Sequence, residues 1–575
     1  PVQINRIPEW LDSLPVTNTQ KSANQLVTLL NRLNRYPLPV AERAAALSQC
    51  KAVAETLIAG LNKSLTRVAY PLPKKAKQPA DTVYQLLNEF AIGYKILVME
   101  LSKARLMPGK KQRLGDAVLA AHQYLSRFIV HCYSLYMAIP EGTWQDIHTL
   151  FSFARDECFR NRENPREDIA HEYKRICLLA LCNPYQLMQG EAENVFNKLD
   201  RWAASVTLTK LAGNRPPEGV YYTDLASDIP PRYALDSSNP ETTEAYAFAV
   251  DGLLRNISQR IKELIDTHAS EQSRAVRRER DLLLRLERAW TTRRRRRFPR
   301  TQHLSEVVLT GSLSACHYYV SGESPFDPEA RELAIQQQMH KELELIPEDY
   351  KPWKLQGGRN RASEAGSGKH ESLFQGHDLN ADIWKKIYVT EYRDPEEKPL
   401  DPAFPAAPLF QLDESVGGLC VRCGADSPLR VQVGELVAYE AGEPRNPDNW
   451  RIGAVRWLIQ SANQDLEIGI KRLARNAEAI AARAVQGVGK NSGFFRALLI
   501  PRADPRDKAT ALIVPSGVYD VGTVIALELG EEILYAQLTK MLETTGCYAV
   551  FAFRIVETPG ESLLRTAGGP EREVP

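Results

Sequence analysis

Residues 293–300 read Arg-Arg-Arg-Arg-Arg-Phe-Pro-Arg, and they divide a chain of 575 residues into a helical part before them and a β-rich part after them. Each guanidinium presents a planar fork of N–H donors that matches phosphate oxygens and the edge of guanine. The stretch also leads directly into a strand-like run. It is therefore suited to clamp an anionic, guanine-bearing nucleotide at the entrance of a sheet.

A second short stretch, Asp413-Glu414-Ser415-Val416-Gly417-Gly418, offers complementary groups. The Asp413 carboxylate can accept hydrogen bonds from the N1–H and N2–H₂ groups of guanine, and Ser415 can add a hydroxyl contact. Gly418 has no Cβ, so its backbone can approach a ligand closely or adopt a positive φ. These residue types also favour a plain β-turn, so the stretch is informative only together with the arginines.

An Arg-x-x-x-Arg pair before a strand, followed on a later strand by Asp-x-Ser-x-x-Gly, resembles the PilZ domain, the bacterial receptor module for cyclic di-GMP. The residues that carry the resemblance are Arg295, Arg296, Arg300, Asp413, Ser415 and Gly418. Arg293 and Arg297 have the same spacing, so a second register of the arginine motif stays open. The resemblance covers about residues 293–320 and 408–482. It implies a β-barrel that binds cyclic di-GMP as a ligand and not as a catalytic cofactor.

The two motifs are farther apart than in a compact PilZ domain, because more than a hundred residues separate Arg300 from Asp413. We therefore expect an insertion in the barrel at about residues 321–405. Its sequence predicts a helix at Pro328–Leu345, a polar mobile loop at Gly357–Gly376 and an added strand at Ile387–Tyr392.

The composition is that of a globular protein, with 43% hydrophobic and 25% charged residues. The net charge is +2, so the positive charge is local, between Arg274 and Arg300, and the chain as a whole is no polyanion binder. No apolar run approaches the length of a membrane span, and no signal-peptide core begins the sequence. Nine scattered cysteines suit free thiols in a reducing compartment. We expect a cytoplasmic protein.

The first two hundred residues predict successive helices. Leu26, Leu29, Leu30 and Leu33 have the spacing of one apolar helix face, and Pro37 ends that helix. Further helices are predicted at Val40–Leu65, Ala80–Leu106, Leu114–Ala138, Thr143–Phe159, Asp168–Leu181 and Gly190–Ala203. No fixed-period repeat is evident, so a helical bundle and a solenoid-like array stay open.

A long helix is expected from Glu241, because Tyr246, Val250 and Leu253 begin an apolar face that continues to Leu264. Asp281–Trp290 is predicted to be helical as well. This rod would end at the arginine cluster and would join the helical part to the nucleotide site.

Strand signals dominate the rest of the chain. The PilZ-like barrel is expected to use Glu306–Val320, Gly417–Arg422, Leu436–Glu440, Arg451–Gln460 and Leu466–Arg472, followed by a helix at Asn476–Val485. More strands are predicted at Phe494–Ile500, Ala509–Val514, Thr523–Leu529, Glu532–Met541 and Cys547–Ile555. They indicate an additional β-rich domain or an extension of the barrel.

Other motifs favour structural roles. Cys420 and Cys423 are spaced as in a metal site, but residues three apart on a strand face opposite sides and no second ligand pair exists, so no metal is expected. Residues 366–370 and 487–491 each lack the first glycine and the hydroxyl residue of a phosphate-binding loop. No histidine pair, paired carboxylates or nucleophile motif indicates an enzyme.

The predicted fold is multidomain α + β: an N-terminal all-α bundle or solenoid-like domain, then a PilZ-like antiparallel β-barrel with an additional β-rich unit. The expected segments are residues 1–235, a connecting helix and arginine-rich linker at 236–297, the barrel at 298–485, the β-rich unit at 486–560 and a disordered tail at 561–575. The predicted function is a cyclic di-GMP receptor that transmits binding to a protein partner through the helical domain. The alternative is a structural or RNA-associated scaffold with a degenerate barrel, although nucleic acid is the less favoured partner.

Overall fold

A computed structural model describes residues 6–15, 18–66, 68–104, 108–156, 169–235, 239–266, 274–291, 299–328, 404–440, 449–461, 465–490, 492–501, 510–529 and 532–556. The chain separates into two compact units. Unit 1 comprises Pro1–Glu306, Leu409–Val433 and Val455–Lys471, and unit 2 comprises Val307–Pro408, Gly434–Ala454 and Arg472–Pro575. Both units therefore receive strands from the region predicted to be a PilZ-like barrel.

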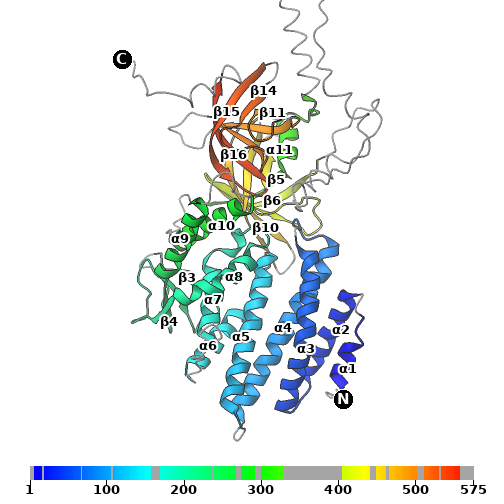
Figure 1. The fold of residues 1–575 in the computed structure, drawn as a ribbon, viewed down its shortest axis with the longest axis vertical. Helices are drawn as coiled ribbons and strands as arrows, with labels where there is room; N and C mark the ends of the chain where they lie inside the picture. Colours follow the sequence, from blue (N-terminus) through cyan, green and yellow to red (C-terminus); the bar gives the residue numbers. More distant parts are fainter. Residues whose placement is uncertain are drawn as a thin grey trace, which may run out of the picture. The chain divides into compact units, whose positions relative to one another are not determined.

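Unit 1 begins with eight α-helices, labelled in Figure 1. They are α1 (Ile7–Asp12), α2 (Thr19–Arg35), α3 (Val40–Asn62), α4 (Lys74–Lys103), α5 (Lys110–Ser134), α6 (Thr143–Asp156), α7 (Ile169–Leu181) and α8 (Glu191–Trp202), with short 3-10 turns at Lys63–Leu65, Pro184–Gln186 and Ala203–Ser205. The helices α2, α3 and α5 all pack on α4, and α5 also contacts α6, α7 and α8. This arrangement is a bundle around α4 and α5, and one continuous apolar core runs through it.

Local sequence explains how these helices form. On α2 the Asn18 side chain accepts a hydrogen bond from the Lys21 amide and caps the first turn, while Leu26, Leu30 and Leu33 are fully buried. None of the helices among the described residues is long and apolar enough to cross a membrane.

A small sheet and a helical hairpin follow the bundle. The sheet has the order β1-β4-β2-β3, from Thr207–Lys210, Ala245–Ala249, Tyr221–Asp224 and Arg232–Tyr233. The predicted long helix from Glu241 is therefore wrong at its start, since Tyr246 lies in strand β4 and α9 begins only at Asp251. Helices α9 (Asp251–Asp266) and α10 (Arg274–Thr291) also run antiparallel and not as one rod, because Ser258 hydrogen-bonds Glu287 while Arg260 contacts Glu279.

The first closed barrel has the strand order β10-β7-β6-β5-β8-β9. Its strands are β5 (Thr301–Gly311), β6 (Ala406–Ser415), β7 (Gly418–Cys423), β8 (Leu436–Glu440), β9 (Trp450–Gln460) and β10 (Leu466–Ala474). The predicted strand Glu306–Val320 is wrong in its second half, where Ser312 caps helix α11 (Leu313–Val320). The predicted elements at Pro328–Leu345, Gly357–Gly376 and Ile387–Tyr392 lie outside the described residues.

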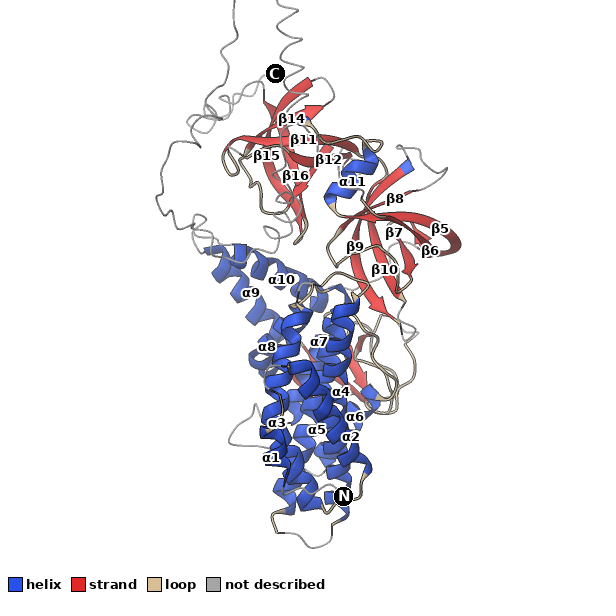
Figure 2. Ribbon diagram, turned by 90° about the vertical axis from the view of Figure 1, so that its right-hand side faces the viewer, coloured by secondary structure: helices blue, strands red, loops and turns tan. Residues whose placement is uncertain are grey.

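The second closed barrel has the order β11-β12-β13-β16-β15-β14 and is the β-rich unit that the sequence predicted. Its strands are β11 (Glu478–Gln486), β12 (Phe495–Pro501), β13 (Thr510–Pro515), β14 (Val524–Leu529), β15 (Glu532–Thr544) and β16 (Tyr548–Val556). Figure 2 shows these strands in red. The predicted helix Asn476–Val485 is wrong, because Ile480, Ala482 and Ala484 alternate along β11 and fill the barrel core.

One apolar core lies within unit 2 between the second barrel and its neighbours. It combines Leu436 and Ala438 of β8 with Leu498 and Ile500 of β12, and Cys316 of α11 joins them. The His317 side chain of α11 also hydrogen-bonds the Ile480 carbonyl at 3.2 Å. The second barrel is therefore built into the same core as β8 and α11.

Candidate ligand-binding site

The structure brings the two motif stretches together in unit 1. Arg300 lies directly before β5, and its Nη1 donates a hydrogen bond to Oδ2 of Asp413 on β6 at 2.7 Å. The two side chains are 34% and 23% exposed, so the pair is partly exposed at the barrel surface. The fold thus brings together Arg300 and Asp413, which lie 113 positions apart in the sequence.

A β-bulge determines which way Asp413 points. Gln411 pairs with Val421 and Asp413 pairs with Cys420, so Leu412 is an extra residue in β6. A bulge shifts every later side chain of its strand to the opposite face of the sheet. Without this extra residue Asp413 would take the other face, and it would not meet Arg300.

The Asp413 carboxylate has one oxygen in use and one unused. Oδ2 accepts from Arg300, whereas Oδ1 is buried and has no hydrogen-bond partner among the residues that the structure describes. A buried, unpaired carboxylate oxygen is costly, so such groups in native proteins usually have a functional reason. Here the oxygen is an acceptor that suits an N–H donor of a ligand.

Ser415 and Gly418 close the β6–β7 hairpin. They are paired across the turn, and the Ser415 hydroxyl donates to the Gly418 carbonyl at 3.2 Å. Gly418 has φ +155°, and a Cβ at this position would lie 2.0 Å from the Ile470 carbonyl oxygen of β10. The glycine is therefore required by the close approach of two strands.

An aromatic side chain that the sequence analysis did not single out borders the site. Asp413, Cys420 and Gly469 are aligned across β6, β7 and β10. A Cβ on Gly469 would lie 2.0 Å from Nε1 of Trp457, so the indole of Trp457 on β9 covers this glycine. The missing Cβ in the middle of a strand was the available signal, because glycine there often marks a close approach of another group.

Comparison with known protein families gives three successive matches. Residues 5–215 match the family described as "Cyclic-di-GMP receptor FimW, N-terminal domain", and residues 480–556 match "FimW C-terminal beta-barrel domain". Between them, residues 220–479 match "Cyclic-di-GMP receptor FimW, middle PilZ domain". The chain contains a PilZ domain. The resemblance predicted from the arginine and Asp-x-Ser-x-x-Gly motifs is thus confirmed.

A curated relative of this PilZ protein covers nearly its full length. The protein from Pseudomonas aeruginosa named "Cyclic-di-GMP receptor FimW" is 26% identical over 590 residues, which span 96% of this chain and 90% of that protein. No solved structure matches the chain. The name of this relative describes a receptor and not an enzyme.

Part of the predicted site lies outside the described residues. Arg295 and Arg296 belong to the stretch 292–298, which the structure does not describe, and the same holds for the alternative pair Arg293 and Arg297. The structure therefore does not test the register of the motif. Of the predicted site residues it places Arg300, Asp413, Ser415 and Gly418.

The cysteine pair of the PilZ barrel has no metal-binding geometry. Burial, together with the nearby carboxylates of Asp413 and Glu467, raises the pKa of the Cys420 thiol to about 12, against the opposing effect of Arg300 and Arg422. The raised pKa favours the neutral thiol form of Cys420, as is usual for a buried structural cysteine. Among the described residues no cluster of His, Cys, Asp and Glu can hold a metal ion.

Two backbone bridges join the PilZ region to the helical bundle within unit 1, one at Val431 between β7 and β8 and one at Gln460 at the end of β9. Tyr70, in the loop before α4, exchanges hydrogen bonds with Val431 at 2.8 and 2.9 Å. Gln460, at the end of the strand that carries Trp457, donates to the Tyr136 carbonyl at 2.7 Å and accepts from the Ala138 amide at 3.0 Å. The helical bundle and the PilZ region thus share backbone hydrogen bonds.

Proposed function

We propose that this chain is a receptor for cyclic di-GMP, which binds on the PilZ barrel at Arg300, Asp413, Ser415 and Gly418 with Arg295 and Arg296 from the preceding stretch. The observation that carries the proposal is the Arg300–Asp413 pair, whose second carboxylate oxygen is buried and unused. The name of the Pseudomonas aeruginosa relative supports the same ligand.

The chemistry of the pair suits this ligand. The guanine N1–H and N2–H₂ groups are donors, and the free oxygen of Asp413 is the acceptor that they require. Arg300 uses one N–H on Asp413 and retains others of its five for a phosphate oxygen. Arg300 can therefore orient Asp413 and bind the ligand at the same time.

Trp457 adds a flat surface beside these polar groups. Its indole is held over Gly469, in line with Asp413 across the sheet. Aromatic faces stack on bases with an energy of roughly 1–3 kcal/mol per base. We assign Trp457 as a side wall against which a guanine of the ligand stacks.

The proposed output is a change in the helical bundle. Ligand binding orders the strands that carry Asp413 and Trp457. The bridge at Gln460 connects the Trp457 strand to the residues after α5, and the bridge at Val431 connects the segment between β7 and β8 to the loop before α4. A ligand shifts such an equilibrium only by its different affinity for the two arrangements. The proposed receptor works in the cytoplasm and has a protein partner on its helices, and it performs no catalysis.

Titration calorimetry of the full chain with cyclic di-GMP at physiological salt tests the proposal. We expect saturable binding, with affinity reduced by about tenfold or more in Arg300→Ala and in Asp413→Ala, because each change removes charge-assisted hydrogen bonds. Arg475→Ala removes an exposed arginine that belongs to neither motif and should bind like the wild type.

Absence of heat with the folded wild type would refute the nucleotide-receptor proposal. A nucleic-acid scaffold would instead bind RNA with an affinity that falls steeply with salt and would be indifferent to Asp413→Ala.

A further inference from the structure

A groove lies between the first two helices, on the N-terminal side of the bundle. Helices α1 and α2 enclose a hollow of about 770 Å³. Its apolar surface comes from Trp10 of α1 and Leu29 of α2, which are partly buried, and from Tyr36, which stands at its end with 49% of its surface exposed, while Ile7 lies buried beneath them. Two neighbouring helices with an open apolar seam between them have the form of a site for a third helix.

The rim of the groove is positively charged. Arg6, Arg32 and Arg35 line it, and none of the described lining residues is acidic. Helix α2 contains no Asp or Glu at all. Within the described part of the chain no carboxylate forms an ion pair with Arg6 or Arg32, whereas Arg35 lies 3.7 Å from Glu89. The groove therefore presents two uncompensated guanidinium groups above an apolar seam.

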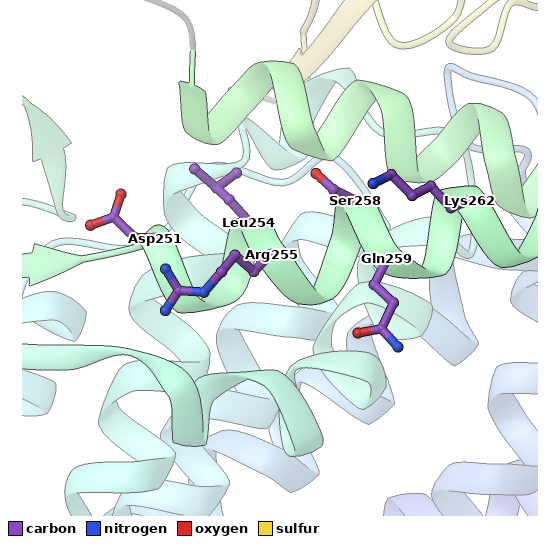
Figure 3. A pocket seen from close by; sticks show the side chains of 6 residues that line it. All are labelled: Asp251, Leu254, Arg255, Ser258, Gln259 and Lys262. Atoms are coloured by element: carbon purple, nitrogen blue, oxygen red, sulfur yellow. The ribbon is translucent and has the colours of Figure 1, made fainter.

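A second hollow in unit 1 provides a contrast. It measures about 570 Å³ and is lined only by α9, as Figure 3 shows. There Asp251 accompanies Arg255 and Lys262, and the Ser258 hydroxyl already donates to Glu287 of α10 at 2.6 Å. This hollow contains charges of both signs, and Leu254 is the one apolar residue in its described lining. It is therefore less suited than the α1–α2 groove to bind an acidic amphipathic helix.

We propose that the α1–α2 groove docks an acidic amphipathic helix of a partner protein. Apolar side chains of that helix would cover Trp10, Leu29 and Tyr36, and its carboxylates would face Arg6 and Arg32. Aromatic and arginine side chains contribute most to protein interfaces, and the charges select the partner by complementarity. The inference is independent of nucleotide binding, since the groove contains no residue of the PilZ site.

The probe is a fluorescein-labelled helical peptide with leucine on one face and glutamate on the other, added to the full chain at physiological salt. Fluorescence anisotropy should show saturable binding. A second peptide with lysine in place of glutamate should not bind. The double variant Arg6→Glu with Arg32→Glu should lose about tenfold or more in affinity, because two attractive charge pairs become repulsive.

The matched control is Arg255→Glu, which reverses an exposed arginine in the α9 hollow of the same unit and should leave the affinity unchanged. A photo-reactive group on the leucine face of the peptide should label α1 or α2. This readout does not depend on how the variants fold.

Four results would overturn the proposal: no saturable binding of the acidic peptide, equal binding of the lysine peptide, labelling confined to other helices, or an equal loss in Arg255→Glu. Displacement of the peptide by single-stranded RNA or by anionic vesicles, lost in the same double variant, would show a general polyanion site and would also overturn it. Titrating the peptide with and without cyclic di-GMP separates this question from the receptor proposal.

Discussion

Single residues of the PilZ site are held in place by strand geometry. The bulge at Leu412 turns Asp413 toward Arg300, and the missing side chains at Gly418 and Gly469 allow close contacts with Ile470 and Trp457. The placement of Asp413 and Trp457 at the barrel surface therefore depends on the bulge and on glycines that do not themselves contact a ligand. Two residue changes test this dependence.

Gly418→Ala should destabilise the first barrel. The added Cβ would meet the Ile470 carbonyl oxygen at 2.0 Å in a backbone conformation that alanine rarely adopts. Such strain costs roughly 1–3 kcal/mol or more, which denaturant unfolding of the barrel would report as a lower free energy of unfolding. Gly424→Ala is the matched control, because no atom lies within 4 Å of its Cβ position. Equal stability of the two variants would contradict the assigned role of Gly418.

Trp457 should report the ligand. If a guanine stacks on its indole, cyclic di-GMP will change the tryptophan emission of the chain, and Trp457→Phe will remove that change. The chain has eight tryptophans, so the variant is needed to assign the signal. Trp202→Phe on α8 serves as the control and should keep the change. An emission change that persists in Trp457→Phe would place the ligand elsewhere.

At the scale of elements, periodicity predicted most of the bundle and the last five strands. Helix α2 and strands β12 to β16 lie close to their predicted ranges because their apolar spacing is regular. The errors occur where composition and packing disagree. The alanine-rich β11 resembles a helix, and the tyrosine- and valine-rich end of α11 resembles a strand, but their partners in the core determine both.

The site could be predicted only as far as motifs reach. Spacing pointed to Arg300 and Asp413, and the structure brings them together. The bulge at Leu412 and the placement of Trp457 over Gly469 arise from pairing between strands, which no local pattern encodes. The contact between Arg300 and Asp413 of β6, which are far apart in the sequence, likewise depends on closure of the barrel.

Helix α5 should make the bundle sensitive to acid. Burial lowers the pKa of His122 to about 3 and the pKa of His131 to about 4, from a usual value of 6.5. Because these pKa values are lower in the folded state, the stability that they represent is present above pH 6.5 and is lost as the pH falls toward 4 and 3. Each group contributes at most about 1.4 kcal/mol per pH unit within that range.

Denaturant unfolding of the bundle from pH 7 to pH 4 measures this slope. In His131→Gln the amide can still donate to the Ala80 carbonyl, which His131 contacts at 3.1 Å, but it does not titrate. The variant should therefore show a shallower loss of stability with acid. An unchanged slope would mean that the pKa of His131 is the same in the folded and unfolded states.

At the scale of the whole molecule, compact units and family boundaries do not coincide. The middle PilZ match ends at residue 479, yet β8 of that match and β12 of the C-terminal barrel share one apolar core in unit 2. In unit 1, strands β6, β7 and β10 belong with the helices. The PilZ region thus contributes strands to both units.

Hydrogen exchange can test whether the site communicates with the bundle. With cyclic di-GMP bound, the Ala138 amide should exchange more slowly, because it donates to Gln460 at the end of strand β9. The Tyr70 amide should do so as well, because it donates to Val431 in the segment that joins β7 to β8. The Tyr36 amide at the end of α2 bonds within its own helix and serves as the control. Equal protection with and without ligand would exclude these bridges as the route.

The bridges at Tyr70 and Gln460 consist only of main-chain atoms, and this has a consequence for divergence. Peptide groups are the same whichever residues carry them, so substitutions on either side leave the junction intact as long as no residue is inserted, deleted or changed to proline at a donor. Orthologues can therefore diverge widely in sequence and still keep the PilZ region hydrogen-bonded to the helical bundle.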